Sequence, residues 1–144
     1  MKLHLKFLFF SLSLILFSCS SEQEGHDNDL AARCFKFEFG LDPKLVNDIY
    51  AKQLVKGDAA RAWYKFRANE KLIDQLKDKG FTVSSAEEFD RHSGGGYSPI
   101  WWEIDNKGQF YLKNKWSANF ADSTAVFSYN KETEEVFFCH DGID

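Results

Sequence analysis

Two cysteines in the body of the chain, Cys34 and Cys139, carry the chemistry with the largest consequence for the fold. In an oxidising compartment an even pair of thiols favours a disulfide, which here would join the two ends of the domain. The chain-entropy model gives such a loop about 4–5 kcal/mol of stabilisation. Two buried free thiols are the alternative. Cys139 and His140 make a poor nucleophile–base pair, because neighbours on a strand point to opposite faces.

Metal and phosphate sites have little support. The histidines that follow the N-terminal segment are His26, His92 and His140, and they show no metal-ligand spacing. The chain has no Cys-x-x-Cys motif. The glycines at 94–96 lack the Lys-Ser/Thr ending of a phosphate-binding loop and are expected in a flexible loop over 92–99. We therefore predict no metal site and no cofactor.

Carboxylates and serines suggest no hydrolase either. Glu103 and Asp105 are two apart on a predicted strand, with about 6.5–7 Å between their Cα atoms. Glycosidases use a similar separation, but alternating acids also keep a sheet face soluble. No G-x-S-x-G motif is present. The sequence therefore predicts a protein that is not an enzyme.

Aromatic residues make up 17% of the chain and are its unusual feature. Adjacent Trp101 and Trp102 would point to opposite faces of a regular strand, so one is expected in the core. The other would be covered by a second layer or available to a partner. Tryptophan is usually buried, but tryptophan and tyrosine are also enriched in binding hot spots. The candidate binding residues are Tyr97, Trp101, Trp102 and Trp116.

The N-terminal 18 residues have the pattern of a signal peptide. Lys2 and Lys6 are followed by an apolar run of 11 residues from Phe7 to Phe17. This run is too short for a hydrocarbon core of about 30 Å, which takes about 20 helical residues. Its length is typical of a signal peptide's apolar region. Residues 1–18 are therefore predicted to be removed and to form no part of the fold.

The run ends in LFSC, residues 16–19, which resembles the lipobox of bacterial lipoproteins. In that family the cysteine is lipidated and becomes the new N-terminus. The resemblance implies lipid attachment at Cys19 and a lipid bilayer as the first partner. Ser20 at the next position favours the outer membrane, facing the periplasm or the cell surface. The resemblance covers about the first 20 residues only.

The remaining chain has room for one domain. The whole chain has 144 residues and a formal net charge of -4, which argues against nucleic acid as a partner. Residues 19–30 are polar, acidic and free of aromatics, so they are expected to form a flexible tether. Ten such residues would hold the domain at most about 35 Å from the membrane. Residues 31–144 are expected to form the domain.

Hydrophobic spacing predicts an α+β domain with a mostly antiparallel sheet and two helices packed on one face. Alternating phenylalanines predict a strand over 34–39. An apolar stripe that follows Asp42 and Pro43 predicts a helix closed by Gly57. The later expected elements are a strand over 61–67, a helix from Asn69 to Gly80, an extended piece over 81–83, a helical turn after Ser85, and strands over 100–104, 109–113, 124–129 and 136–139.

These features favour binding over catalysis. The segment from Trp63 to Cys139 is also similar to small bacterial proteins of unknown function, which implies no activity. The leading hypothesis is a lipid-anchored protein-interaction module of inhibitor or immunity type, whose acidic surface attracts a basic protein partner. A glycan- or peptidoglycan-binding module that uses an exposed tryptophan is the alternative. A small envelope enzyme without a recognisable site is the third.

Overall fold

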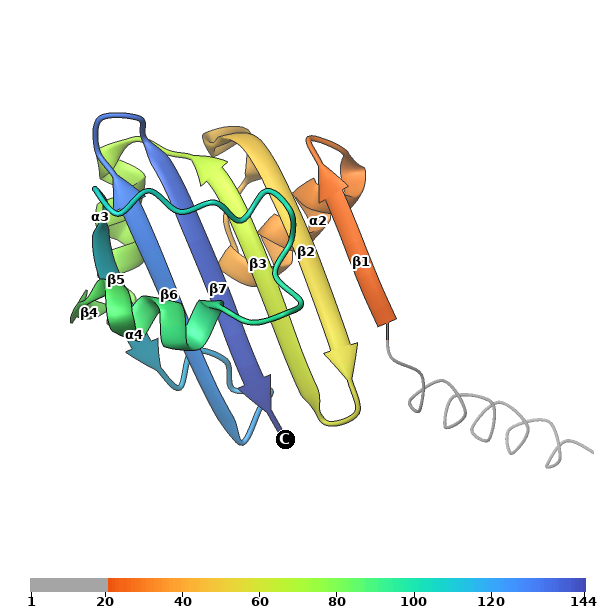
Figure 1. Cartoon of the computed structure of the whole chain (residues 1–144). Coiled ribbons are helices and arrows are strands. Elements are labelled where there is room, and N and C mark those ends of the chain that lie inside the picture. Colours follow the sequence, from red (N-terminus) through yellow and green to blue (C-terminus); the bar gives the residue numbers. More distant parts are fainter. Residues whose placement is uncertain (1–20) are drawn as a thin grey trace, which may run out of the picture.

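The computed structural model describes residues 21–144, which form a seven-stranded antiparallel sheet with helices on both faces (Figure 1). The strands are β1 (Ser21–His26), β2 (Asn47–Lys56), β3 (Ala59–Arg67), β4 (Thr82–Ser84), β5 (Gln109–Asn114), β6 (Asp122–Asn130) and β7 (Glu135–Ile143). Their order in the sheet is β1-β2-β3-β7-β6-β5-β4. The α-helices are α2 (Asp29–Phe39), α3 (Glu70–Lys77) and α4 (Ala86–Ser93). The predicted α+β class is confirmed.

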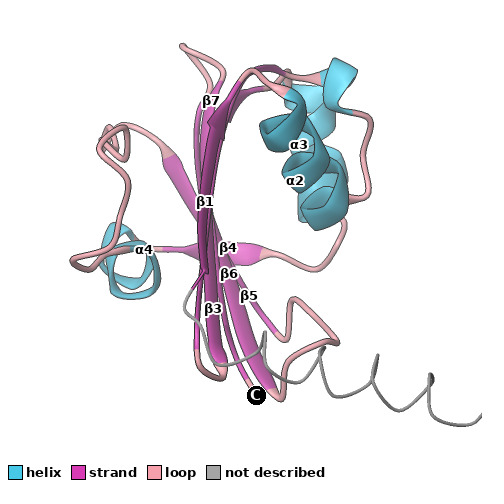
Figure 2. Ribbon diagram, turned by 90° about the vertical axis from the view of Figure 1, so that its right-hand side faces the viewer, coloured by secondary structure: helices cyan, strands magenta, loops and turns pink. Residues whose placement is uncertain are grey.

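Two layers cover the sheet (Figure 2). Helices α2 and α3 pack on one side, which we call the helical face. Helix α4 and the irregular segment 94–108 cover the other side, which we call the opposite face. Two helices do pack on one face as expected, but only α3 is one of the two predicted helices, because α2 lies where a strand was expected. Helix α4 adds a third helix on the opposite face. None of the helices in residues 21–144 is long and apolar enough to cross a membrane.

Residues 34–39 belong to helix α2, so the predicted strand there is wrong. The side chain of Asn28 accepts a hydrogen bond from the Ala31 amide and starts the helix, and Gly40 ends it with a φ of 65°. Phe35 and Phe39 are one helical turn apart and fully buried, whereas Phe37 between them is 79% exposed. The phenylalanines at every second position, which suggested a strand, therefore include Phe37, which lies outside the core.

The predicted helix after Pro43 is also wrong, because only a single 3₁₀ turn, Pro43–Leu45, precedes strand β2. Strand β2 pairs with β1 on one side and with β3 on the other. Gly57, at a φ of 63°, makes the turn between β2 and β3 instead of closing a helix. The apolar residues after Pro43 have a spacing that fits both a helix and a strand. Pairing with β1 and β3 makes the segment a strand.

Two further segments differ from their predictions. Residues 21–30, expected to be a tether, form β1 and the start of α2, while residues 19 and 20 lie outside the described part. Lys52 pairs with Glu22 at 2.8 Å, and Trp101 donates to Glu24 at 2.7 Å, so polar side chains hold this edge strand. Residues 100–104, expected to be a strand, belong to the irregular segment on the opposite face.

The predicted disulfide between Cys34 and Cys139 is wrong. Cys34 packs in the core of the helical face, and Cys139 packs with Trp63 and Phe137 on the opposite face. The sheet separates the two thiols, and both are free and buried. Burial raises the pKa of each thiol, which keeps it protonated and unreactive at neutral pH.

We expect a Cys19→Ser chain to contain two thiols that react with a thiol reagent only after unfolding, without any reductant. The cause is burial on two different faces, which prevents both oxidation and attack. Thiol titration in buffer and in denaturant measures this, with a further Cys34→Ser change lowering the count to one. A count of zero in unreduced, unfolded protein would contradict the structure.

Candidate functional site

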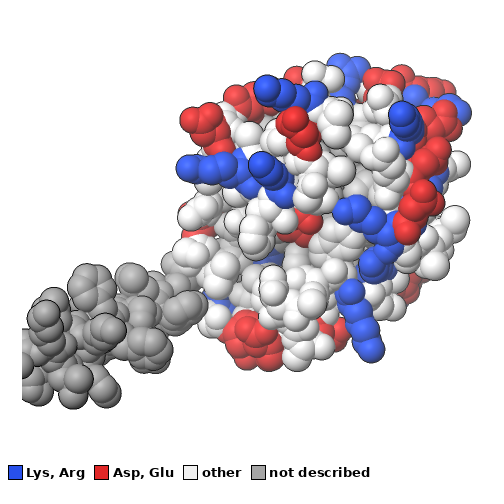
Figure 3. Space-filling view, turned by 180° about the vertical axis from the view of Figure 1, so that it is seen from behind, with Lys and Arg blue, Asp and Glu red and all other residues white. Residues whose placement is uncertain are grey.

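A cleft of about 790 Å³ lies on the helical face. Its floor is formed by β2, β3 and β7, and its walls by the end of α2 and the segment 115–121 that joins β5 to β6. The volume is within the range of roughly 300–1,000 Å³ typical of small-molecule sites. Figure 3 shows this face, where uncharged surface at the centre is surrounded by charged side chains.

The lining of the cleft is mostly apolar, with a few polar groups. The apolar lining residues are Phe37, Leu54, Val55, Ala60, Ala62, Trp116, Ala118 and Phe120. The polar and charged ones include Glu38, Gln53, Lys79, Lys113, Asn119 and His140. An apolar cavity with a few polar groups is the usual form of a site that binds a small molecule or an apolar side chain.

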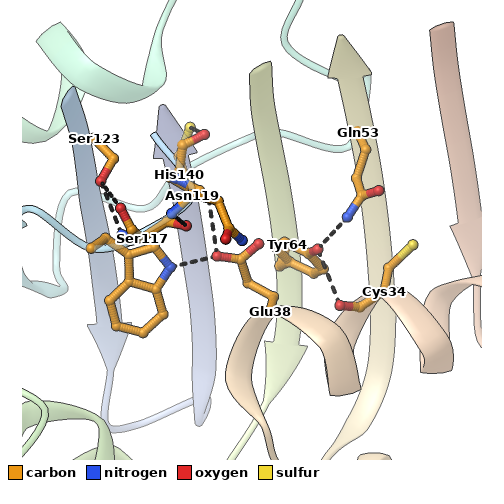
Figure 4. A network of polar contacts seen from close by, with 10 residues as sticks. Cys34, Glu38, Gln53, Tyr64, Ser117, Asn119, Ser123 and His140 are labelled. Atoms are coloured by element: carbon orange, nitrogen blue, oxygen red, sulfur yellow. Dashed lines mark hydrogen bonds and ion pairs between the residues drawn. The ribbon is translucent and has the colours of Figure 1, made fainter. Parts of the chain in front are cut away.

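Glu38 and His140 form the polar centre of the cleft (Figure 4), and Trp116 lines the cleft beside them. Glu38 Oε1 accepts a hydrogen bond from Trp116 Nε1 at 2.5 Å and lies 3.2 Å from His140 Nδ1. The side chains of Glu38 and His140 are only 6% and 9% exposed. Because Nδ1 faces the carboxylate, Nε2 is the ring nitrogen left for a ligand.

Within the described residues, His140 Nε2 is buried without a hydrogen-bond partner. Most buried polar atoms in proteins are paired, and an unpaired one costs about 1–3 kcal/mol. His140 also lines the cleft, where the Phe120 ring packs edge-on against it. The arrangement offers one unused hydrogen-bonding position among apolar walls.

Alternation along β7 places this histidine. Cys139 points to the opposite face, where its Sγ lies 3.7 Å from the His92 carbonyl oxygen, and His140 points to the helical face. The two neighbours therefore do not form a nucleophile–base pair. On α2, the burial of Phe35 and Phe39 fixes the helix on the sheet, and Glu38 in the last turn reaches the cleft.

A second group of polar contacts fixes the floor of the cleft. Gln53 donates to the Tyr64 hydroxyl at 2.8 Å, and that hydroxyl donates to the Cys34 carbonyl oxygen at 3.3 Å (Figure 4). Burial raises the pKa of Tyr64 far above its ordinary value, so the phenol stays neutral. The amide of Gln53 is thereby held against the floor.

The segment 115–121 is held against the sheet at two points. Ser123 Oγ accepts from the Ser117 amide at 2.9 Å and donates to its carbonyl oxygen at 3.2 Å. The Phe120 ring packs edge-on to His140, with 5.6 Å between ring centroids. This packing needs Gly142, because a Cβ there would lie 2.6 Å from the Phe120 ring. A glycine on β7 therefore determines where one wall of the cleft stands.

A carboxylate paired with an imidazole can serve more than one chemistry. A carboxylate that orients an imidazole is also the geometry of a general base. However, no hydroxyl or thiol of the described residues is hydrogen-bonded to His140 Nε2, so no nucleophile is paired with it. Residues 21–144 also contain no group of three metal-ligating side chains. Among the described residues that line the cleft, His140 Nε2 is a buried polar atom left without a partner.

The predicted binding residues do not form one patch. Trp102 stacks on Phe89 and meets Phe137 edge-on, on the opposite face. Trp101 lies beside it, and the two indoles partly cover the core of that face. Tyr97, 56% exposed, follows α4 in the segment over the same face. Trp116 alone lines the cleft on the helical face.

Sequence reasoning missed Glu38 and gave His140 no role of its own. The two residues come from opposite ends of the chain, and neither belongs to a motif with fixed spacing. Their pairing depends on residues 34–39 being helical, so the wrong prediction of a strand there concealed it. The available signal was a polar residue next to apolar ones: Glu38 lies between two phenylalanines, and His140 follows an apolar run.

Comparisons with models of protein families, with curated proteins and with solved structures give no match for this chain.

We expect Glu38→Ala to destabilise the protein by about 2–4 kcal/mol, because Trp116 Nε1 and His140 Nδ1 both lose their acceptor in a buried place. Glu38→Gln keeps an acceptor oxygen, so this variant should lose less stability than Glu38→Ala. Urea unfolding at constant slope measures both changes. Glu87→Ala, at an exposed position on α4, is the control. Equal stability of Glu38→Ala and wild type would show that the carboxylate is not needed.

Proposed function

We propose that the protein is a lipid-anchored binding protein of the bacterial outer membrane, and that the cleft on the helical face is its ligand site. The observation that carries this proposal is His140 Nε2, a buried nitrogen without a partner in a largely apolar cleft. A ligand that occupies the cleft gains burial of apolar surface and one hydrogen bond that the free protein lacks.

The lining indicates what the ligand must offer. Its body must be apolar, to pack against Val55, Phe120 and Trp116. It must also carry one hydrogen-bonding group that reaches His140. When Nδ1 carries the proton shared with Glu38, neutral imidazole presents Nε2 as an acceptor, which suits a hydroxyl or an N–H group.

A protein-interaction module of inhibitor or immunity type is the second candidate. Phe37 and Val55, on the rim of the cleft, are 79% and 41% exposed, and exposed apolar side chains at a cavity are typical of protein contact sites. In this form an apolar side chain of a partner protein would enter the cleft. The glycan-binding alternative has less support, because Trp101 and Trp102 pack together over the core of the opposite face.

The lipid anchor would hold the domain close to the bilayer. Strand β1 begins at Ser21, two residues after Cys19. Two extended residues span about 7 Å, far less than the tether expected from sequence. The end of the sheet at which β1 begins would therefore face the membrane. This orientation is part of the proposal, since it depends on lipidation of Cys19.

A bulky side chain in the cleft should abolish ligand binding. We expect Val55→Trp to reduce binding of the fluorescent probe N-phenyl-1-naphthylamine at least about tenfold, by filling the space that the probe needs. Val83→Trp is the matched control, because Val83 is 84% exposed on β4 and outside the cleft. Titration of probe emission measures both. The same affinity in both variants would rule out the cleft as the site.

Replacement of the lipobox cysteine tests the anchor separately. We expect Cys19→Ser to abolish incorporation of labelled fatty acid and to release the protein from membranes, because several acyl chains are needed for stable anchoring. Metabolic labelling followed by flotation of membranes measures this. Ser20→Ala is the control and should stay labelled. A Cys19→Ser protein that still floats with membranes would refute the lipid anchor.

A further inference from the structure

We infer that the cleft takes up a single-chain amphiphile from the bilayer, with the hydroxyl group of its head on His140 and its hydrocarbon chain directed toward the membrane. This inference rests on the proposed binding function and on the proposed anchor. It adds the chemical class of the ligand and the place from which the ligand comes.

The cleft lies at the end of the sheet where the described chain begins. Ser21, the first residue of β1, is paired with Val55, which lines the cleft. Figure 1 shows the start of β1, the turn between β2 and β3 and the C-terminus at the same end. Ala60, after that turn, and Phe120 also line the cleft. An anchor two residues before Ser21 would therefore bring this opening to the bilayer surface.

The distribution of polarity in the cleft suits a ligand that arrives from a membrane. Phe37 and Val55 are exposed apolar side chains of the cleft, which Lys79 and Lys113 also line, and the polar groups Glu38 and His140 are buried. Here Phe37 and Val55 would contact hydrocarbon chains, and the hydrogen bond is available only inside.

The chemistry at His140 favours a hydroxyl head over an acidic one. A hydroxyl both donates and accepts, so it can bond to Nε2 whether or not this nitrogen carries a proton. A carboxylate head would bring a second negative charge near Glu38, which lies 3.2 Å from the same ring. A volume of about 790 Å³ suits one chain with a small head. A monoacylglycerol or a long-chain alcohol has these properties.

The first test measures the hydrogen bond in solution with two probes. Decanol carries a hydroxyl, and decyl methyl ether has a similar chain but no donor. We expect decanol to displace N-phenyl-1-naphthylamine about tenfold more effectively from the wild-type protein, and the preference to vanish in His140→Phe. His92→Phe, on helix α4, is the control and should keep the preference. A preference unchanged in His140→Phe would overturn the assignment of the head site.

The second test measures uptake from a bilayer. The lipidated protein is reconstituted in phosphatidylcholine vesicles that contain a monoacylglycerol with a brominated chain, because bromine quenches indole emission at short range. We expect quenching that Trp116→Phe removes, since Trp116 lines the cleft. Trp101→Phe is the control, because Trp101 lies on the opposite face and its loss should leave the quenching intact. Val55→Trp should prevent the quenching at Trp116.

The outcomes separate this inference from the proposed function. Decanol binding without monoacylglycerol quenching would overturn uptake from the membrane and leave the ligand site standing. Failure of every apolar probe to bind would overturn both. Quenching of equal size by brominated phosphatidylcholine would show mere proximity to the bilayer and would overturn the inference. A protein crosslinked from position 37 in cells, lost in Val55→Trp, would assign the cleft to a protein side chain instead.

Discussion

The central strands of the sheet are apolar on both sides, and the architecture follows from the need to cover them. On β7, Val136 and Phe138 face helices α2 and α3, while Phe137 and Cys139 face α4 and the segment 94–108. A sheet with one solvated face would alternate apolar and polar residues, so a continuous apolar strand requires two covering layers. Two short helices cover only part of the helical face. The cleft lies on this face, between the end of α2 and the segment 115–121.

The same constraint explains the use of the aromatic residues. On the opposite face, where the cover is one short helix and an irregular segment, Trp101 and Trp102 supply much of the missing apolar surface. On the helical face, Trp116 reaches from the segment after β5 to the end of α2 and donates to Glu38. Each of these three indoles covers part of the sheet that the helices leave uncovered. Only Trp116 does so beside a cavity.

Sequence reasoning succeeded where local signals and long-range pairing agree. The helix capped by Asn69 and the strands around 61–67, 124–129 and 136–139 are present, because turn residues and apolar spacing define them locally. It failed where a spacing fits two periods, as over 34–39, and where an edge strand has no apolar pattern, as over 21–26. The pairing of Glu38 with His140 depends on these elements and could not be predicted without them.

The place of β7 in the chain governs when this domain can fold. Strand β7 is the last element in sequence but lies between β3 and β6 in the sheet, so it joins the two halves. Until its residues are available, the strands β1 to β3 and the strands β4 to β6 have no common core. Pairs that are far apart in the sequence, such as Ala59 with Ile143, cannot form before then. Such non-local pairing makes folding slow. A machinery that threads the chain from its N-terminus therefore meets an unfolded polypeptide until β7 has passed.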